Sequence, residues 1–130
     1  MKKLTLLLLL MTSTNVLAEW IEITRSKDGD ITVYVDYVTR KKKGNKVKMW
    51  RLFDYKTVHI GPTNDRYLSS VVHNEFDCEE ETIRMLDLYI YSRNMRQGDA
   101  VKSEHNIKEE ATSIIPESIS DGLLIKACDK

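Results

Sequence analysis

The sequence predicts an α+β fold: an antiparallel twisted sheet of five or six strands, with a C-terminal helix packed on one face and tied by a disulfide. Three observations lead to this prediction. Segments rich in β-branched and aromatic residues alternate with turn residues from 20 to 103. The pattern changes to a helical period after Pro116. Two cysteines, Cys78 and Cys128, follow the fourth predicted strand and end the predicted helix.

Turn residues divide the predicted sheet into segments. The strands are predicted at 20–24, 31–36, 47–54, 67–76, 82–91 and 100–103. Segment 47–54 has apolar residues on both faces, which favours a central strand buried on both sides or an oligomer contact. Segment 82–91 has apolar residues at both odd and even positions, so the sequence does not show which of its two faces points to the core. Residues 105–112 are polar, with local helical character at best.

The C-terminal helix is predicted from apolar spacing. Ile119, Leu123 and Ala127 share one helical face with their neighbours Leu124 and Cys128. Ser118 or Ser120 can cap the start of the helix. Because so short a helix is marginal alone in water, we expect a disulfide to pin it to the sheet.

The N-terminus predicts export. Lys2 and Lys3 precede an apolar run too short to cross a bilayer, and the run leads to a small residue, Ala18. Residues 1–18 are therefore a predicted signal peptide, and residues 19–130 one mature domain. Further apolar spans and an acylated cysteine at the cleavage point are lacking. We therefore expect a periplasmic or secreted protein without a membrane anchor.

The cysteine pair is most simply a disulfide in an oxidising compartment. A Cys78–Cys128 bond closes a loop of about 50 residues, worth about 4 kcal/mol by chain entropy. A redox pair is disfavoured because there is no Cys-x-x-Cys. A zinc site is disfavoured because no pair of histidines lies at ligand spacing.

Acidic and basic residues are balanced at 20 each, which predicts no nucleic-acid partner. One basic cluster nevertheless interrupts the chain. Its lysines either form a solvated hairpin tip that discourages edge pairing, or a docking patch for an acidic partner. The candidate binding patch consists of Arg40, Lys41, Lys42, Lys43, Lys46 and Lys48.

The sequence indicates no catalytic site, metal or cofactor. His59, His73 and His105 are scattered, and neither a Gly-x-Ser-x-Gly motif nor a Gly-rich phosphate loop is present. Asp36, Asp54 and Asp77 are interpreted as residues that close strands. An enzyme would require a deep pocket that joins His73 to a carboxylate, for which the sequence offers Asp77 as a neighbour on the same face.

Most aromatic residues of the strands are expected in the core. Tyr34, Tyr89 and Tyr91 are the ones that can lie on the face opposite the helix. If they are exposed together, they mark an association surface, because aromatic residues are enriched at interfaces.

The ordered landmarks of the mature chain resemble the surface-adhesin protein E family of Gram-negative bacteria. They are Trp20, Tyr34–Asp36, Val47–Trp50, Ser69–Ser70, Phe76–Cys78, Tyr91–Ser92, Gly98, Val101–Ser103 and Cys128. The resemblance implies the same sheet, helix and cysteine pair. It also implies homodimers and binding to extracellular-matrix proteins such as vitronectin or laminin.

The predicted function is therefore an exported, non-enzymatic, adhesin-like binding protein. One alternative is a soluble periplasmic envelope protein or a small proteinaceous enzyme inhibitor, because a stapled domain of this size can present a rigid loop.

Overall fold

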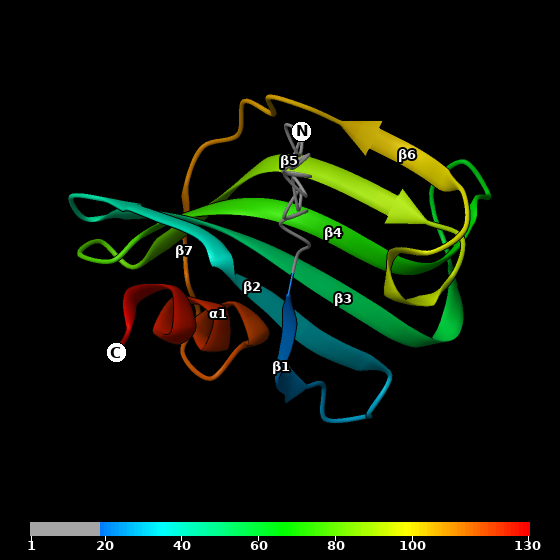
Figure 1. Cartoon of the computed structure of the whole chain (residues 1–130), viewed down its shortest axis with the longest axis horizontal. Coiled ribbons are helices and arrows are strands. Elements are labelled where there is room, and N and C mark those ends of the chain that lie inside the picture. The colour runs from blue at the N-terminus through cyan, green and yellow to red at the C-terminus, as the bar shows by residue number, and fades with distance from the viewer. Residues whose placement is uncertain (1–18) are drawn as a thin grey trace, which may run out of the picture.

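The computed structural model describes residues 19–130, so the predicted signal peptide lies outside the described residues. Residues 19–130 form one sheet and one α-helix (Figure 1). The elements are β1 (Trp20–Arg25), β2 (Ile31–Lys43), β3 (Lys46–Ile60), β4 (Arg66–Asp77), β5 (Thr82–Tyr91), the 3₁₀ turn η1 (Asn94–Arg96), β6 (Ala100–Glu104), β7 (Thr112–Ser113) and α1 (Ile119–Cys128).

The sheet is an antiparallel meander in the order β1-β2-β3-β4-β5-β6. The predicted antiparallel sheet and C-terminal helix are therefore confirmed. A seventh strand, β7, pairs with the start of β5 through Ile83–Thr112 and Thr82–Ser113. This strand was not predicted, because two polar residues give no strand signal by themselves. It leads the chain from the β6 edge back to α1.

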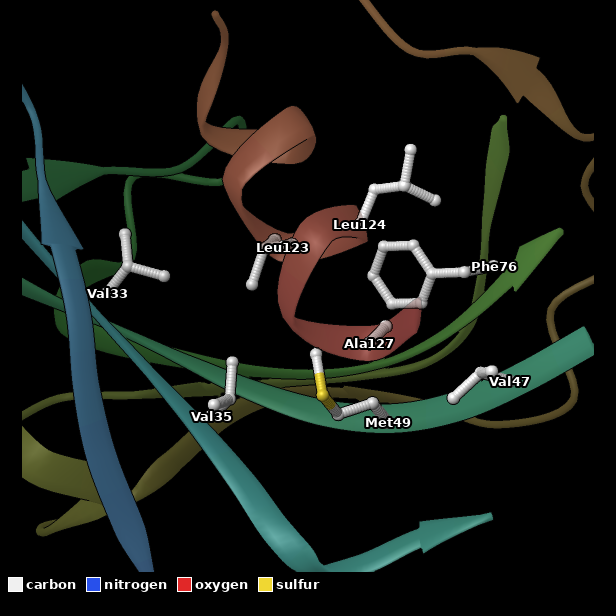
Figure 2. Packing of buried hydrophobic residues seen from close by; sticks show 8 residues of the cluster. All are labelled: Val33, Val35, Val47, Met49, Phe76, Leu123, Leu124 and Ala127. Atoms are coloured by element: carbon white, nitrogen blue, oxygen red, sulfur yellow. The ribbon is translucent and has the colours of Figure 1, made fainter. Parts of the chain in front are cut away.

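The hydrophobic core lies between α1 and one face of the sheet. β2 and β3 alternate strictly here, so Val33, Val35, Val47 and Met49 point to the helix and are fully buried. The helix and β4 complete this cluster with Phe76, Leu123, Leu124 and Ala127, as Figure 2 shows. The apolar spacing that predicted the helix thus also predicted the residues it buries.

Local bonds hold both ends of α1. Ser118 caps the start, since its hydroxyl accepts a hydrogen bond from the Asp121 amide at 3.2 Å. At the other end the Cys78–Cys128 disulfide joins the helix to the end of β4, with Cα atoms 5.8 Å apart. Arg40 of β2 donates to the Ala127 carbonyl at 2.9 Å and to the Asp129 carboxylate at 2.8 Å. A cation is favourable there because the helix C-terminus is partly negative.

The interpretation of Asp36 and Asp54 as strand ends is wrong, whereas Asp77 does end β4. Asp36 and Asp54 lie within β2 and β3, each directly before a register shift. The Asp36 carboxylate accepts from the Val38 amide at 3.0 Å and the Thr39 hydroxyl at 2.8 Å. Each aspartate thus marks an irregularity at which the strand continues instead of turning.

Candidate functional site

The candidate site lies on the face of the sheet opposite α1, which we call the opposite face. One row of paired residues crosses five strands on this face: Trp20, Asp36, Trp50, His73 and Asp87. Because side chains alternate between the faces of a strand, the apolar core residues Val35 and Met49 force their neighbours Asp36 and Trp50 onto this side.

The centre of the opposite face is hollowed into an aromatic groove of about 380 Å³. The groove is lined by Trp20, Asp36, Thr39, Trp50, Val71, Tyr89, Tyr91 and Arg96. Trp50 and Tyr89 lie with ring centroids 6.0 Å apart, and both are half-buried. Tyr34, Tyr89 and Tyr91 all lie on the opposite face, and Tyr89 and Tyr91 share the groove. Such half-exposed rings are suited to bind a partner.

His73 packs flat against Trp50, with ring centroids 4.4 Å apart and planes 8° from parallel. Its Nδ1 lies 3.2 Å from the Asp87 carboxylate, so the partner of His73 is Asp87 on the neighbouring strand, not Asp77. Burial lowers the pKa of His73, Asp87 opposes this shift, and Lys48 and Lys41 add to it. Burial thus favours the uncharged form of the ring, which stacks on the indole of Trp50.

The basic hairpin, residues 41–48, lies at one end of the sheet. Lys41 pairs with Lys48 and Lys43 with Lys46 across the turn at Gly44, whose positive φ of 61° suits glycine. These lysines are exposed and, with Lys42 and Glu75, line a second hollow of about 740 Å³. The structure thus brings five of the six predicted patch residues together. Arg40 is separate, because its guanidinium is bound to the end of α1.

A strained loop places Arg96 at the rim of the aromatic groove. Met95 and Arg96 both have left-handed backbones, with φ of 52° and 63°, at a cost of about 1–3 kcal/mol each. Asp54 holds the loop by accepting from the Met95 amide at 2.8 Å and from Asn94 at 3.1 Å. The Ser69 hydroxyl accepts from the Arg96 amide at 3.0 Å. Sequence reasoning missed this loop, because its strain depends on contacts with β3 and β4.

A second acid–histidine pair lies at the far end of β3. His59 Nε2 is 2.6 Å from the Asp30 carboxylate, which also accepts from the Thr57 hydroxyl at 2.6 Å and the Thr57 amide at 3.0 Å. These hydrogen bonds, that of Thr57 above all, lower the pKa of Asp30. The pair ties the β1–β2 turn to β3, and the His59 ring packs on Tyr55 at 4.1 Å.

Neither histidine pair has the geometry of a catalytic triad. Within residues 19–130, the His73 ring bonds only to Asp87 and the His59 ring only to Asp30, so a hydroxyl or thiol nucleophile is missing from both. The same residues contain no cluster of three His, Cys, Asp or Glu side chains that could hold a metal ion. Of the helices in the described part, none is long and apolar enough to span a membrane.

Comparison with known proteins identifies the family of this chain. The family model described as "Surface-adhesin protein E" matches residues 20–129. The chain belongs to this family. It is thus an adhesin-like protein by descent, and the resemblance noted from the sequence landmarks is confirmed. No match was found among curated protein sequences.

Solved structures of Haemophilus influenzae protein E share the fold of this family member. Crystal form II is 14% identical, with a TM-score of 0.62 over 89% of this chain and 91% of that chain. A second structure gives 14% identity and a TM-score of 0.60, covering 89% and 88%. The protein from a non-typeable strain gives 14% and 0.55, covering 89% and 76%. At this identity the likeness establishes the fold alone.

Two features of the site had partial signals in the sequence. The basic hairpin was visible as a run of lysines, and the three tyrosines as candidates for the opposite face. The contributions of Trp20 and Trp50 to the aromatic groove were not predicted, because an aromatic residue in a strand is equally consistent with a place in the core. The covalent link between Cys78 and Cys128, predicted from a lone pair of cysteines, is present.

Proposed function

We propose that this protein is exported and works as a non-enzymatic adhesin whose partners are host extracellular-matrix proteins, with vitronectin and laminin as the first candidates. The observation that carries the proposal is family membership over residues 20–129, combined with a basic hairpin and an aromatic groove on one face. Exposed lysines steer an acidic partner, and half-buried aromatic rings supply apolar contact area.

The basic hairpin is proposed to make the first contact. Lys41, Lys42 and Lys43 are exposed, and the hairpin is fixed to the rest of the sheet by the pairing of β2 with β3. Because only Glu75 contributes a negative charge to the lining of this hollow, the local field is positive although the whole chain is neutral. Such a field accelerates association and weakens with salt.

Surface plasmon resonance with immobilised vitronectin and laminin tests the proposal. The wild-type protein is expected to bind in a saturable way, and K41A/K42A/K43A is expected to bind about tenfold more weakly. The control K27A/K56A/K108A removes three exposed lysines elsewhere and should bind like wild type. Binding to neither matrix protein would overturn the proposed partners. An equal loss of affinity in both triple variants would show that the basic hairpin is not the contact site.

Export is tested separately by fractionating the native cells. Cleavage after Ala18 predicts an intact mass that starts at Glu19, with both sulfurs oxidised. Protein found at the surface or in the medium supports an adhesin, whereas retention in the periplasm would favour an envelope role. Sedimentation of the same material tests the proposed homodimer.

A further inference from the structure

The basic hairpin and the aromatic groove form one continuous surface on the opposite face. Lys48 precedes Trp50 by two residues in β3, so their side chains project to the same side. Lys41 pairs with Lys48 across β2 and β3, and His73 stacks on Trp50 across β3 and β4. The lysines therefore stand directly beside the rings, and a single ligand can contact both hollows.

Three carboxylates on this surface have hydrogen-bond donors or cations of the protein as partners. Glu75 is bound by Arg84 at 2.9 Å and lies 3.7 Å from Lys46. Asp36 accepts from the Val38 amide and the Thr39 hydroxyl, and Asp87 is bound to His73. At the hairpin end of the surface, five lysines stand against one carboxylate, Glu75, so this end is positively charged. Arg96 adds a guanidinium at the other end, where its Nε lies 3.4 Å from the Tyr91 hydroxyl.

The position of this surface within the sheet limits what can bind. Side chains from β1 to β5 line the groove, and its centre lies over β3 and β4, which are paired to strands on both sides. A peptide therefore cannot add a strand at the centre of the groove, since that mode needs a free sheet edge. Recognition must depend on side chains alone: ring faces in the groove and cations at its two ends.

We propose that this surface binds an acidic polysaccharide, a glycan that carries sulfate or uronate groups. Lysine and arginine bind such anions through charge-assisted hydrogen bonds. The electron-rich faces of Trp50 and Tyr89 attract the C–H groups of a sugar ring, as they attract other positive edges. The strained backbone at Arg96 fits this role, because it fixes a cation beside the rings before the ligand arrives. This inference rests on the proposed binding role and names the partner chemistry of the same face.

Heparin is the probe for this proposal, and tryptophan fluorescence is the readout. The chain has two tryptophans, Trp20 and Trp50, and both line the aromatic groove. A saturable change of emission on titration with heparin oligosaccharides is therefore expected. Neutral dextran should give no change, and poly-glutamate should bind at least about tenfold more weakly than heparin, because it has charge but no sugar rings.

Two sets of variants separate the charges from the rings. K41A/K48A and R96Q remove cations, and each should weaken heparin binding, with a smaller dependence of affinity on salt. Y89L removes a ring and should weaken binding with the salt dependence unchanged. Y67L is the matched control, since Tyr67 lies outside the aromatic groove. Circular dichroism melts select the variants that keep the fold, and R96Q changes an exposed side chain that the core does not use.

Three results would overturn the inference. They are heparin binding without any change of tryptophan emission, heparin binding that Y89L leaves intact, and poly-glutamate binding as tight as heparin binding. Binding to vitronectin and laminin is measured on the same samples. If these proteins bind and heparin does not, the glycan inference fails while the proposed function stands. If heparin binds and the matrix proteins do not, the reverse holds.

Discussion

The two faces of the sheet are built from the same strands but differ in how their central aromatic and apolar side chains are covered. On the helix side, Val35, Met49 and Phe76 are fully buried under α1. On the opposite face, Trp50 and Tyr89 are half-buried. The η1 loop is bonded to Asp54 and Ser69 on this face, whereas the rings of Trp50 and Tyr89 line the open groove. Since alternation along each strand produces both faces together, a change on one side tests stability and a change on the other tests binding.

The largest expected loss of stability comes from truncating a large side chain in the core. Phe76→Ala should lower the free energy of unfolding by about 3–5 kcal/mol, because it leaves a cavity under α1. Tyr89→Ala on the opposite face should cost only about 1 kcal/mol, since part of its ring is already in water. Urea denaturation of both variants measures the contrast. Equal losses would show that the opposite face is a second core rather than a binding surface.

The disulfide gives the next largest effect on the helix side. Cys128→Ser should lower stability by about 2–5 kcal/mol, because it frees a loop of 50 residues between Cys78 and the helix end. Thermal melts with and without reductant provide the same comparison in the wild-type chain. Identical midpoints would contradict a structural role for the bond. Loss of the bond should affect α1 more than the basic hairpin, which amide hydrogen exchange can resolve.

A smaller effect on stability is expected from pH, through His73 on the opposite face. The pKa of His73 is lowered in the folded protein, chiefly by burial, so the unfolded chain takes up the proton first. Stability should therefore fall as the pH drops through about 6.5, by at most about 1.4 kcal/mol per pH unit. His73→Gln should flatten this dependence between pH 7.5 and 5.5 in urea titrations. An unchanged slope in the variant would assign the effect to other groups.

The fold was largely predictable because local patterns and global packing agree. The period in α1 and the alternation in β2 both point to the core that the structure contains, and Ser118 caps the helix as one of two predicted residues. The wrong predictions concern residues whose structure depends on pairing between several strands. Asp36 and Asp54 are turn-forming residues by type, yet pairing on both sides carries their strands onward.

The site was less predictable than the fold, for a related reason. The run of lysines could be recognised from the sequence alone. Arg40, however, lies outside the patch because its guanidinium is bound to the carbonyl of Ala127 at the end of α1. The pairing of His73 with Asp87 depends on the register between β4 and β5, which sequence spacing does not reveal. Likewise, the stacking of His73 on Trp50 joins residues 23 positions apart through the pairing of β3 with β4.

Lysine labelling of the protein bound to vitronectin shows which face of the sheet contacts the partner. Reductive methylation read by mass spectrometry reports each lysine, bound and free, in one experiment. We expect protection of Lys41, Lys43 and Lys48 on the opposite side from the helix, with Lys126 of α1 labelled as in the free protein. Protection of Lys126 instead of the basic hairpin, or no protection at any lysine, would contradict it.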